Sequence, residues 1–435
     1  MGQTEPSHQP PLKFLAWLPE LKREVWILAA GQLLLFIGQG FTLVYAAIYF
    51  VNTLGFSPTQ VGLALGSGGI SGTLGRFWAG NAIDSPRFGR RVTLLVAAAI
   101  AALGSFCLAF ASTFALLVAG NLLLGLGISL YWPATLAVTT DLTPAAHLTE
   151  AMALTRLADN LGLGLGAFIA GQYIAWGGDY PVLFICKGLA YLVFALVIFG
   201  AIAETHPRHP PSPHLWQNWA AALRDRCFIT YLLANLFFTT YAAQLSSTLP
   251  LYLANFLPGG NTETGFSEQV ISYFFVWHAL LKIGLQLPIT RWLRAVPQVN
   301  ILLGSLGLWS ISFCFIWLAG VVSVNSLGVV LVAFASVAFA EILYAPSASA
   351  LVGNLAPERL RGVYFSLESE CWAIGFLVGP AVGGWALDQP NQIGLNFWLM
   401  LVGSAAIAGG LLLRLRQQLA APAAAVDGVE PAGEA

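Results

Sequence analysis

The stretch from Glu341 to Gly384, EILYAPSASALVGNLAPERLRGVYFSLESECWAIGFLVGPAVGG, decides how the chain is interpreted. It contains an apolar segment with one acid, a short charged loop, and a second apolar segment rich in glycine. A related stretch lies 213 residues upstream, from Ile128 to Gly171, and aligns with it without gaps. The matching positions are Tyr131 and Tyr344, Pro133 and Pro346, Leu142 and Leu355, Pro144 and Pro357, Gly162 and Gly375, Gly166 and Gly379, and Gly171 and Gly384. These matches in one register indicate an internal duplication. Where the second copy has Glu341 the first has Ile128, so the copies differ at an ionisable residue.

The composition indicates a membrane protein. Hydrophobic residues make up 57% of the 435 residues and charged residues only 9%, whereas soluble domains have about 25% charged residues. A water-soluble fold could not bury so much apolar surface, which predicts an all-α polytopic membrane protein. The five cysteines form no CxxC pair, so we expect packing residues rather than a metal site or a disulfide framework.

Apolar runs of about 20 residues, the length that crosses a bilayer, recur along the whole chain. Twelve are predicted, at about 26–51, 59–82, 92–111, 114–138, 157–176, 181–202, 227–256, 269–289, 299–320, 324–350, 363–386 and 395–413. They divide the chain into a six-helix bundle at 26–202 and another at 227–415. A polar N-terminal segment (1–25), a linker (203–226) and an Ala/Pro-rich tail (416–435), which we expect to be disordered, complete the chain.

Lysine and arginine are confined to one side of the predicted spans. The loops without either residue are 52–58, 112–113, 177–180, 257–268, 321–323 and 387–394. The opposite side holds Arg87, Arg90, Arg91, Arg208, Arg224, Arg226, Arg291, Arg294, Arg359, Arg361, Arg414 and Arg416. Cytoplasmic loops carry the excess of Lys and Arg. Both termini are therefore predicted to lie in the cytoplasm, with the chain in the plasma (inner) membrane.

The linker at 203–226 separates two halves that share a second repeat. YFVNTL at 49–54 recurs as YLANFL at 252–257, and GFSPTQV at 55–61 recurs as GFSEQV at 265–270. Such parallel repeats predict two pseudo-symmetric bundles related by an axis along the membrane normal. The linker's prolines break any helix before Leu215, after which WQNWAAAL can lie along the membrane interface. We interpret its three histidines as part of a solvated linker rather than a metal site.

The first cytoplasmic hairpin reads GNAIDSPRFGRR from Gly80 to Arg91. It resembles the signature loop between helices two and three of the major facilitator superfamily, although Ser85 and Pro86 are inserted after the acid. The residues that match the pattern are Gly80, Asp84, Arg87, Gly89, Arg90 and Arg91. With the spans, the duplication and the charge distribution, the chain is identified as a member of this superfamily from residue 26 to about 415. The resemblance implies a gating loop in which Asp84 contacts the cytoplasmic end of helix eleven in the outward-facing state.

Helix eleven carries a motif that is similar to GxxxGPxxGG, which antiporters of the superfamily have in helix five. The matching residues are Gly375, Gly379, Pro380, Gly383 and Gly384. Close helix packing with a kink is the alternative interpretation. LAPERLRGVYFSL, just before this motif, resembles the drug:proton antiporter relatives. Those relatives often have an Arg in helix four, four residues before a glycine, and here that position is Asn121.

Ionisable groups inside the spans are candidates for function, because each costs about 2.5–3.5 kcal/mol on insertion scales. Glu341 ranks first, in helix ten, with Tyr344 on the same face. His278 and Lys282 share a face of helix eight at a similar depth, so Lys282 can pair with Glu341. The three are candidates for proton coupling, and a static buried ion pair is the alternative. Near the predicted cytoplasmic helix ends lie Arg76, Asp159, Glu368 and Glu370, where snorkelling or loop pairing explains a charge.

The superfamily resemblance also implies a central cavity bordered by helices one, four, seven and ten. The side chains expected to line it are Gln39, Tyr45, Asn121, Tyr131, Tyr241, Gln244 and Tyr344. Aromatic, amide and hydroxyl groups with one acid suit an apolar or weakly cationic solute. Sugar phosphates or nucleotides would require several cations in the cavity.

These observations predict a secondary transporter that works by alternating access and exports small amphipathic molecules in exchange for protons. We expect a monomer in the lipid bilayer, without a cofactor, a metal or a nucleic-acid partner. An uncoupled facilitator or importer of a small neutral solute, and a transporter-like sensor, remain as alternatives. An enzyme is not expected, because the sequence has no GxSxG, HExxH or ATP-binding loop and no intramembrane His/Asp cluster.

Overall fold

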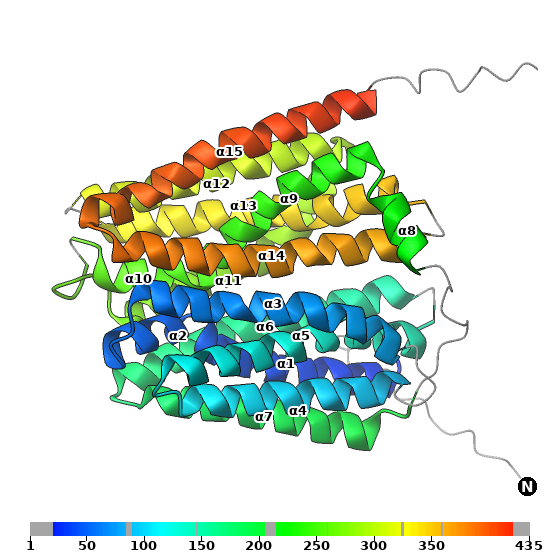
Figure 1. Cartoon of the computed structure of the whole chain (residues 1–435), viewed down its shortest axis with the longest axis horizontal. Coiled ribbons are helices and arrows are strands. Elements are labelled where there is room, and N and C mark those ends of the chain that lie inside the picture. The colour runs from blue at the N-terminus through cyan, green and yellow to red at the C-terminus, as the bar shows by residue number, and fades with distance from the viewer. Residues whose placement is uncertain are drawn as a thin grey trace, which may run out of the picture.

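The computed structural model describes residues 21–83, 89–144, 147–204, 215–258, 260–322, 326–357 and 360–420. The regular secondary structure of these residues is entirely helical (Figure 1). The N-terminal half contains α1 (Arg23–Leu43), α2 (Tyr45–Ile48), the π-helical turn η2 (Tyr49–Thr53), α3 (Pro58–Ile83), α4 (Gly89–Ala109), α5 (Phe114–Leu142), α6 (Leu148–Ala175) and α7 (Tyr180–Ala201). The C-terminal half contains α9 (Arg226–Ser246), α10 (Thr248–Asn255), α11 (Glu268–Trp292), the 3-10 turn η4 (Leu293–Ala295), α12 (Gln298–Val321), α13 (Ser326–Leu355), α14 (Arg361–Asp388) and α15 (Asn391–Ala420).

The described helices reproduce the predicted spans. Ten of them, with α1, α2 and η2 taken as one, are long and apolar enough to cross a membrane. The other two, α3 and α6, have 26 and 28 residues and pack among the ten. The short helix α8 (Leu215–Ala222) lies in the linker, where the sequence predicts an interfacial segment. Residues 1–20, the linker residues 205–214, Asp84, Arg87 and the tail after residue 420 fall outside the described part of the chain.

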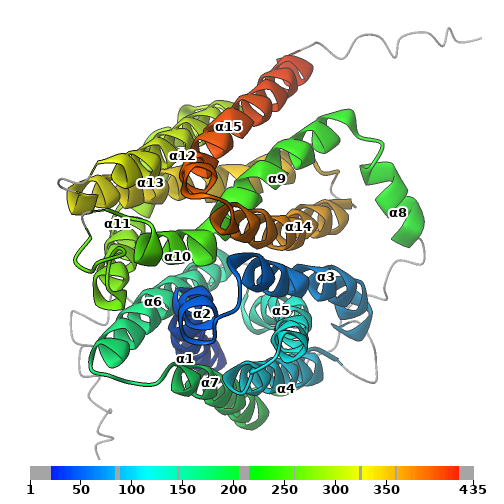
Figure 2. The same cartoon turned by 60° about the vertical axis from the view of Figure 1, so that its left-hand side comes forward.

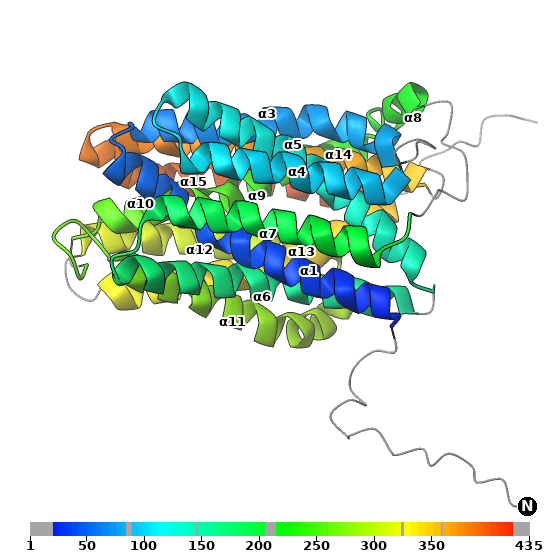
Figure 3. The ribbon, with the colours of Figure 1, turned by 90° about the horizontal axis from the view of Figure 1, so that it is seen from below.

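The helices form two bundles, one from each half of the chain (Figure 2). In the N-terminal bundle α1 packs on α6 and α7, and α4 packs on α5 and α7. In the C-terminal bundle α12 packs on α13 and α15, and α14 packs on α9. The most extensive contacts between the bundles join α3 with α14 and α6 with α11, and a smaller contact joins α2 with α10. The second of these pairs is also visible from below in Figure 3.

Two predicted boundaries need correction. Helix α6 begins at Leu148, not at residue 157, because its first two turns, LTEAMALTR, are too polar to be recognised by hydropathy. The seventh span is not one continuous helix, because the chain leaves helical geometry at Ser247, where φ is −128° and ψ is −70°. It consists of α9 followed by α10, as the first span consists of α1 followed by α2 and η2.

Candidate functional site

The structure brings the three proton-coupling candidates together. Nζ of Lys282 lies 2.7 Å from Oε2 of Glu341, and Nε2 of His278 lies 3.2 Å from the same oxygen. His278 and Lys282 are one turn apart on α11, and Glu341 projects from α13. The Glu341 side chain is 17% exposed and that of Lys282 is 25% exposed. A partly exposed carboxylate that lies between two basic groups can gain and lose a proton as its surroundings change.

Tyr344, one turn after Glu341, ties α13 to α9. Its hydroxyl donates to Oδ1 of Asn235 at 2.7 Å, and its ring stacks on Phe238 with the centroids 4.9 Å apart. On the other side of α13, Gln286 of α11 donates to the backbone carbonyl of Ile342 at 3.2 Å. A change in the charge of Glu341 therefore acts on a helix that contacts both α9 and α11.

The N-terminal bundle contains an equivalent amide–tyrosine pair. Nε2 of Gln32 on α1 donates to the hydroxyl of Tyr131 on α5 at 3.1 Å. Tyr131 is the repeat counterpart of Tyr344, and the register that matches Tyr49 with Tyr252 also matches Gln32 with Asn235. Both amides are buried, at 1% and 0% exposure. Our sequence interpretation missed this pair, although extending the YFVNTL repeat toward the N-terminus would have found it.

Of the cavity candidates on the N-terminal bundle, Gln39 and Tyr45 contact neighbouring helices, whereas Asn121 bonds within its own helix. Gln39 accepts a hydrogen bond from the hydroxyl of Tyr191 at 3.4 Å, and Asn121 donates to the carbonyl of Leu117 in its own helix at 2.9 Å. The hydroxyl of Tyr45 donates to the carbonyls of Ala167, at 3.1 Å, and Glu268, at 3.3 Å. Because Glu268 begins α11, Tyr45 lies at a junction between the bundles.

The two candidates on α9 are enclosed within the C-terminal bundle. Gln244 is 1% exposed and donates to the carbonyl of Gly379 at 3.0 Å. The hydroxyl of Tyr241 lies 2.7 Å from Oγ of Ser404 on α15, and its ring packs against Trp309 and Phe313 on α12. The described contacts of Tyr241 therefore lie toward α12 and α15, and its assignment to a central cavity stays a prediction.

Four charges assigned to cytoplasmic helix ends lie between the bundles or deep within the fold. Asp159 is eleven residues into α6, about 16 Å along the helix, and is only 5% exposed. Arg76 of α3 pairs with Glu370 of α14 at 3.5 Å, which links the two bundles. Glu368 lies two residues before Glu370 on α14. The prediction of snorkelling is wrong for Asp159, because α6 begins earlier than the hydropathy indicates.

Lys187 on α7 lies inside the N-terminal bundle. It is 3% exposed, and its Nζ donates to Oγ1 of Thr42 at 2.9 Å. No carboxylate lies within ion-pair distance of it among the described residues. Lys187 is therefore a buried amine with a neutral partner, unlike Lys282.

The described residues of the signature loop hold the start of α4 against α5 and α7. Gly89 has a φ of +67°, which favours glycine at the turn into α4. Arg90 forms an ion pair with Asp141 near the end of α5. The guanidinium of Arg91 lies 4.7 Å from the centre of the Phe199 ring on α7. Gly80 lies in the last turns of α3, whereas Asp84 and Arg87 are outside the described residues.

The glycines of the GxxxGPxxGG motif lie on α14, where this helix approaches three neighbours. A Cβ at Gly375 would lie 2.5 Å from Oγ1 of Thr239 on α9, and one at Gly379 would lie 2.7 Å from Cβ of Ala243. Gly383 faces Thr248 on α10 in the same way. Gly384 and the carbonyl of Pro380 instead contact the start of α3, at Pro58 and Gly62 respectively. A side chain at any of these glycines would force α14 away from a neighbouring helix.

At the end of the molecule opposite α8, side chains join the two bundles directly. Asn52 and Asn255, which are repeat counterparts, donate to each other's Oδ1 at 2.9 and 2.7 Å. Further links across the bundles are Thr59 Oγ1 to Asp388 Oδ2 at 2.5 Å, Tyr180 to Glu268 Oε1 at 2.8 Å, and Gln269 to Gln172 at 2.9 Å. These contacts close this end of the molecule.

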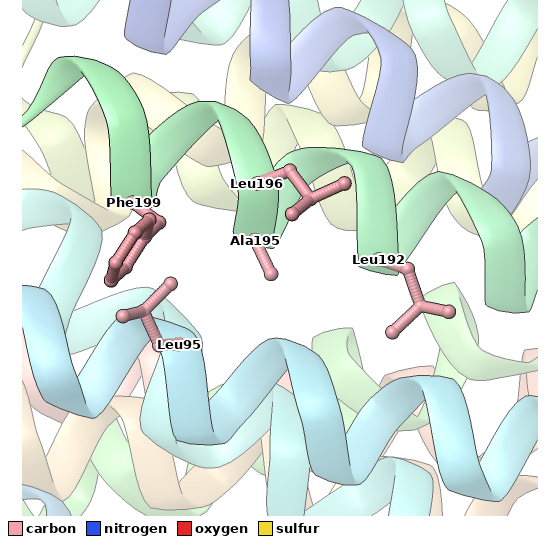
Figure 4. Close-up of a pocket in the computed structure, with 5 residues that line it drawn as sticks. All are labelled: Leu95, Leu192, Ala195, Leu196 and Phe199. Atoms are coloured by element: carbon pink, nitrogen blue, oxygen red, sulfur yellow. The ribbon is translucent and has the colours of Figure 1, made fainter.

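A pocket of about 400 Å³ lies between α4 and α7 (Figure 4). Its lining is entirely apolar and consists of Leu95, Leu192, Ala195, Leu196 and Phe199. Leu196 and Phe199 are 70% and 63% exposed. The pocket therefore belongs to the outer, lipid-facing surface of the N-terminal bundle and lacks the polar groups that would orient a transported solute.

The structure has two pseudo-symmetric bundles of membrane-spanning helices. Ionisable side chains lie inside the bundles, and hydrogen bonds join the bundles at one end. This arrangement is typical of the class of secondary transporters. The chain matches the Major Facilitator Superfamily over residues 28–261 and 253–432, and it belongs to that family. This confirms the predicted superfamily and fold. The chain is thus a multi-pass membrane transporter and not an enzyme.

Curated relatives and solved structures agree with this assignment. Multidrug resistance protein MdtH of Photorhabdus laumondii subsp. laumondii is 26% identical over 367 residues, covering 83% of this chain and 86% of that protein. MdtH of Yersinia pestis is 26% identical over 389 residues, covering 86% and 91%. The nucleoside transporter NupG superposes with a TM-score of 0.74 at 13% identity, covering 91% of this chain and 100% of that one. A POT family transporter in complex with 5-aminolevulinic acid has a TM-score of 0.76 at 14% identity, covering 93% and 99%. At these identities the structural likeness shows the fold alone.

Proposed function

We propose that the chain exports small amphipathic molecules in exchange for protons, by alternating access, as the MdtH relatives' description as multidrug resistance proteins suggests. The observation that carries the coupling is the Glu341 carboxylate, held by Lys282 at 2.7 Å and His278 at 3.2 Å. We propose a monomer as the working unit, because one chain contains both bundles. Light scattering of the purified protein would measure that unit directly, and a stable dimer would contradict this part of the proposal.

Protonation of Glu341 would remove the negative charge that attracts Lys282 and His278. Helix α13 would then be held less firmly against α11. Tyr344 follows one turn later on α13 and donates to Asn235 of α9, so a shift of α13 reaches a second helix. If solute binds more tightly while Glu341 is ionised, solute and proton compete for the transporter and exchange across the membrane.

The test is a Glu341→Gln variant in proteoliposomes, with an amphipathic fluorescent dye as the transported probe. Glutamine keeps the shape of the protonated acid but cannot release a proton. We expect dye accumulation driven by a pH gradient to fall at least about tenfold, while dye exchange without a gradient continues. Glu341→Asp keeps a carboxyl group and is the matched control, which should retain coupling. Full gradient-driven accumulation by the Gln variant would place the coupling group elsewhere.

The same assay separates the alternatives. An uncoupled facilitator would equilibrate the dye at a rate that does not respond to the pH gradient, and an importer would accumulate it in the opposite direction. A transporter-like sensor would bind the dye without moving it. In each of these three alternatives the ion pair of Glu341 would only pack α13 against α11 and would not couple solute to protons.

We further propose that both termini face the cytoplasm and that the membrane is the plasma (inner) membrane. The one-sided arginine distribution supports this, as does the position of α8 at the end of the molecule opposite the Asn52–Asn255 contact. Reporter fusions after Leu257 and Gln392 should report the outside, and fusions after Arg91 and Arg361 the inside. A reversal at any of these positions would refute the orientation.

A further inference from the structure

The first turn of α3 lies against the last turn of α14, at the closed end of the molecule opposite α8 (Figure 1). A Cβ at Gly384 would meet the backbone carbonyl of Pro58, and a Cβ at Gly62 would meet the carbonyl of Pro380. The two helices, one from each bundle, therefore touch through their backbones here. Asp388 follows Gly384 by one turn, so this contact also fixes its position relative to α3.

The backbone amides at the start of α3 have a defined set of partners. Ser57 and Gln60 form a reciprocal capping box, in which the Gln60 amide donates to Oγ of Ser57 at 3.2 Å and the Ser57 amide donates to Oε1 of Gln60 at 3.0 Å. Pro58 has no N–H to satisfy. The amide of Thr59 remains, and it donates to Oδ2 of Asp388 at 3.3 Å. The C-terminal bundle thus completes the cap of a helix that belongs to the N-terminal bundle.

The same oxygen of Asp388 also accepts a hydrogen bond from Oγ1 of Thr59 at 2.5 Å. A carboxylate at a helix N-terminus is further stabilised by the aligned peptide dipoles. The loops at this end contain no Lys or Arg. Besides α8, the helices packed against α14 are α3, α9, α10, α13 and α15, and their halves nearest the closed end contain no Asp, Glu, His, Lys or Arg. The titratable groups there are the buried Tyr241 and Tyr252, so Asp388 depends on α3 alone.

The duplication supplies a second, equivalent seam without this acid. Helices α6 and α11 meet at the closed end as α14 and α3 do, and their contact there is the neutral pair of Gln269 and Gln172, at 2.9 Å. In the duplication register Asp388 coincides with Ala175. The neutral pair shows that the fold can close a seam without a charge. The acid on the other seam adds a property that an amide lacks, which is that it can be protonated.

We propose that Asp388 is the latch of the closed end, a positioning residue whose ionised carboxylate caps α3 and holds the bundles together, and whose protonation releases them. A protonated carboxyl has no charge to interact with the helix dipole, and one of its oxygens becomes a donor. Asp388 is exposed in this closed structure, so a proton reaches it directly from solvent. In the orientation proposed above, external acid would therefore open the transporter toward the outside. The inference rests on the proposed alternating access and adds a control of it that is separate from Glu341.

The test measures the separation of the bundles by double electron–electron resonance on the full-length protein in detergent. Spin labels at Ser112→Cys and Val321→Cys, in a background without the five native cysteines, report one exposed position on each bundle at this end. Asp388→Asn should raise the fraction of molecules with the longer distance severalfold, because it removes a charge from a helix N-terminus. Thr59→Val should act in the same direction and Thr59→Ser should not. Combining Thr59→Val with Asp388→Asn should add little, because both remove the same contact.

Asp179→Asn is the matched control. Asp179 is an exposed acid that precedes α7 within its own bundle, so its neutralisation should leave the distances unchanged. The response to protons is measured in a Glu341→Gln background, where the proposed coupling acid cannot contribute. Lowering the pH from neutral to about 4 should raise the long-distance fraction severalfold when Asp388 is present, and much less in Asp388→Asn.

An unchanged distance distribution in Asp388→Asn, or an equal acid response with and without Asp388, would overturn the latch. Gel filtration and thermal unfolding show whether each variant is folded, and Thr59→Val tests the same contact without altering the acid. The measurement uses no gradient and no solute. Gradient-driven transport that persists in Glu341→Gln would therefore refute the coupling scheme and leave this result unaffected.

Discussion

At the scale of single residues, the two lysines inside the helical bundles, Lys187 and Lys282, have different partners. Lys282 pairs with Glu341 at 2.7 Å, whereas Lys187 donates to the hydroxyl of Thr42 at 2.9 Å. Removing one partner of a buried ion pair leaves an uncompensated charge, which is more damaging than replacing both partners. Removing a lysine whose partner is a neutral hydroxyl leaves no such charge.

We therefore predict that Lys282→Met lowers the melting temperature in detergent more than the double variant Lys282→Met/Glu341→Gln does. The coupling free energy from the double-mutant cycle should be about 1–3 kcal/mol. Partial exposure of both side chains keeps it at this moderate level. Lys187→Met is the control and should leave the melting temperature unchanged or higher. Additive effects of the two single substitutions would show that Lys282 and Glu341 do not stabilise each other.

At the scale of helices, the junction of α3 and α14 depends on glycine. A Cβ at Gly66 would lie 2.6 Å from the backbone carbonyl oxygen of Leu377, whereas at Gly72, on the same helix, the nearest atom would be 3.8 Å away. We predict that Gly66→Ala reduces transport severalfold, because backbone atoms cannot yield without separating the helices. Gly72→Ala is the matched control and should transport normally. Equal transport rates for the two variants would show that transport does not require close contact between α3 and α14 at this junction.

The number of spans and the duplication were predictable from the sequence because both depend on long apolar runs and fixed spacing. The start of α6 was not predictable from hydropathy, since LTEAMALTR is polar yet helical. The predicted helix therefore began too late, which placed Asp159 too close to its end. The Lys282–Glu341 pair was predictable from helix depth. The direction of Tyr241 was not, because helical periodicity gives a residue's place on its helix but not which neighbour covers that face.

At the scale of the whole molecule, contacts between the bundles are unevenly distributed. At the end opposite α8 the bundles are joined by Asn52 with Asn255, Thr59 with Asp388, and Tyr180 with Glu268. Toward the other end the described ion pair between bundles is Arg76 with Glu370, at 3.5 Å. Alternating access requires the closed end to open during each cycle. The reciprocal Asn52–Asn255 contact lies between repeat counterparts, so separation of the bundles about the pseudo-symmetry axis must break it.

We predict that a covalent link at this contact stops transport. Asn52→Cys/Asn255→Cys, in a background without the five native cysteines, should lose at least about tenfold of its transport rate after treatment with a short bifunctional thiol reagent, because the outward-open state becomes inaccessible. The matched control is Asn261→Cys/Ser267→Cys, whose side chains lie 2.9 Å apart within one loop of the C-terminal bundle. Cross-linking there leaves the bundles free to separate, so transport should continue. If the cross-linked Asn52/Asn255 variant transports as fast as the untreated one, the bundles do not part at this end.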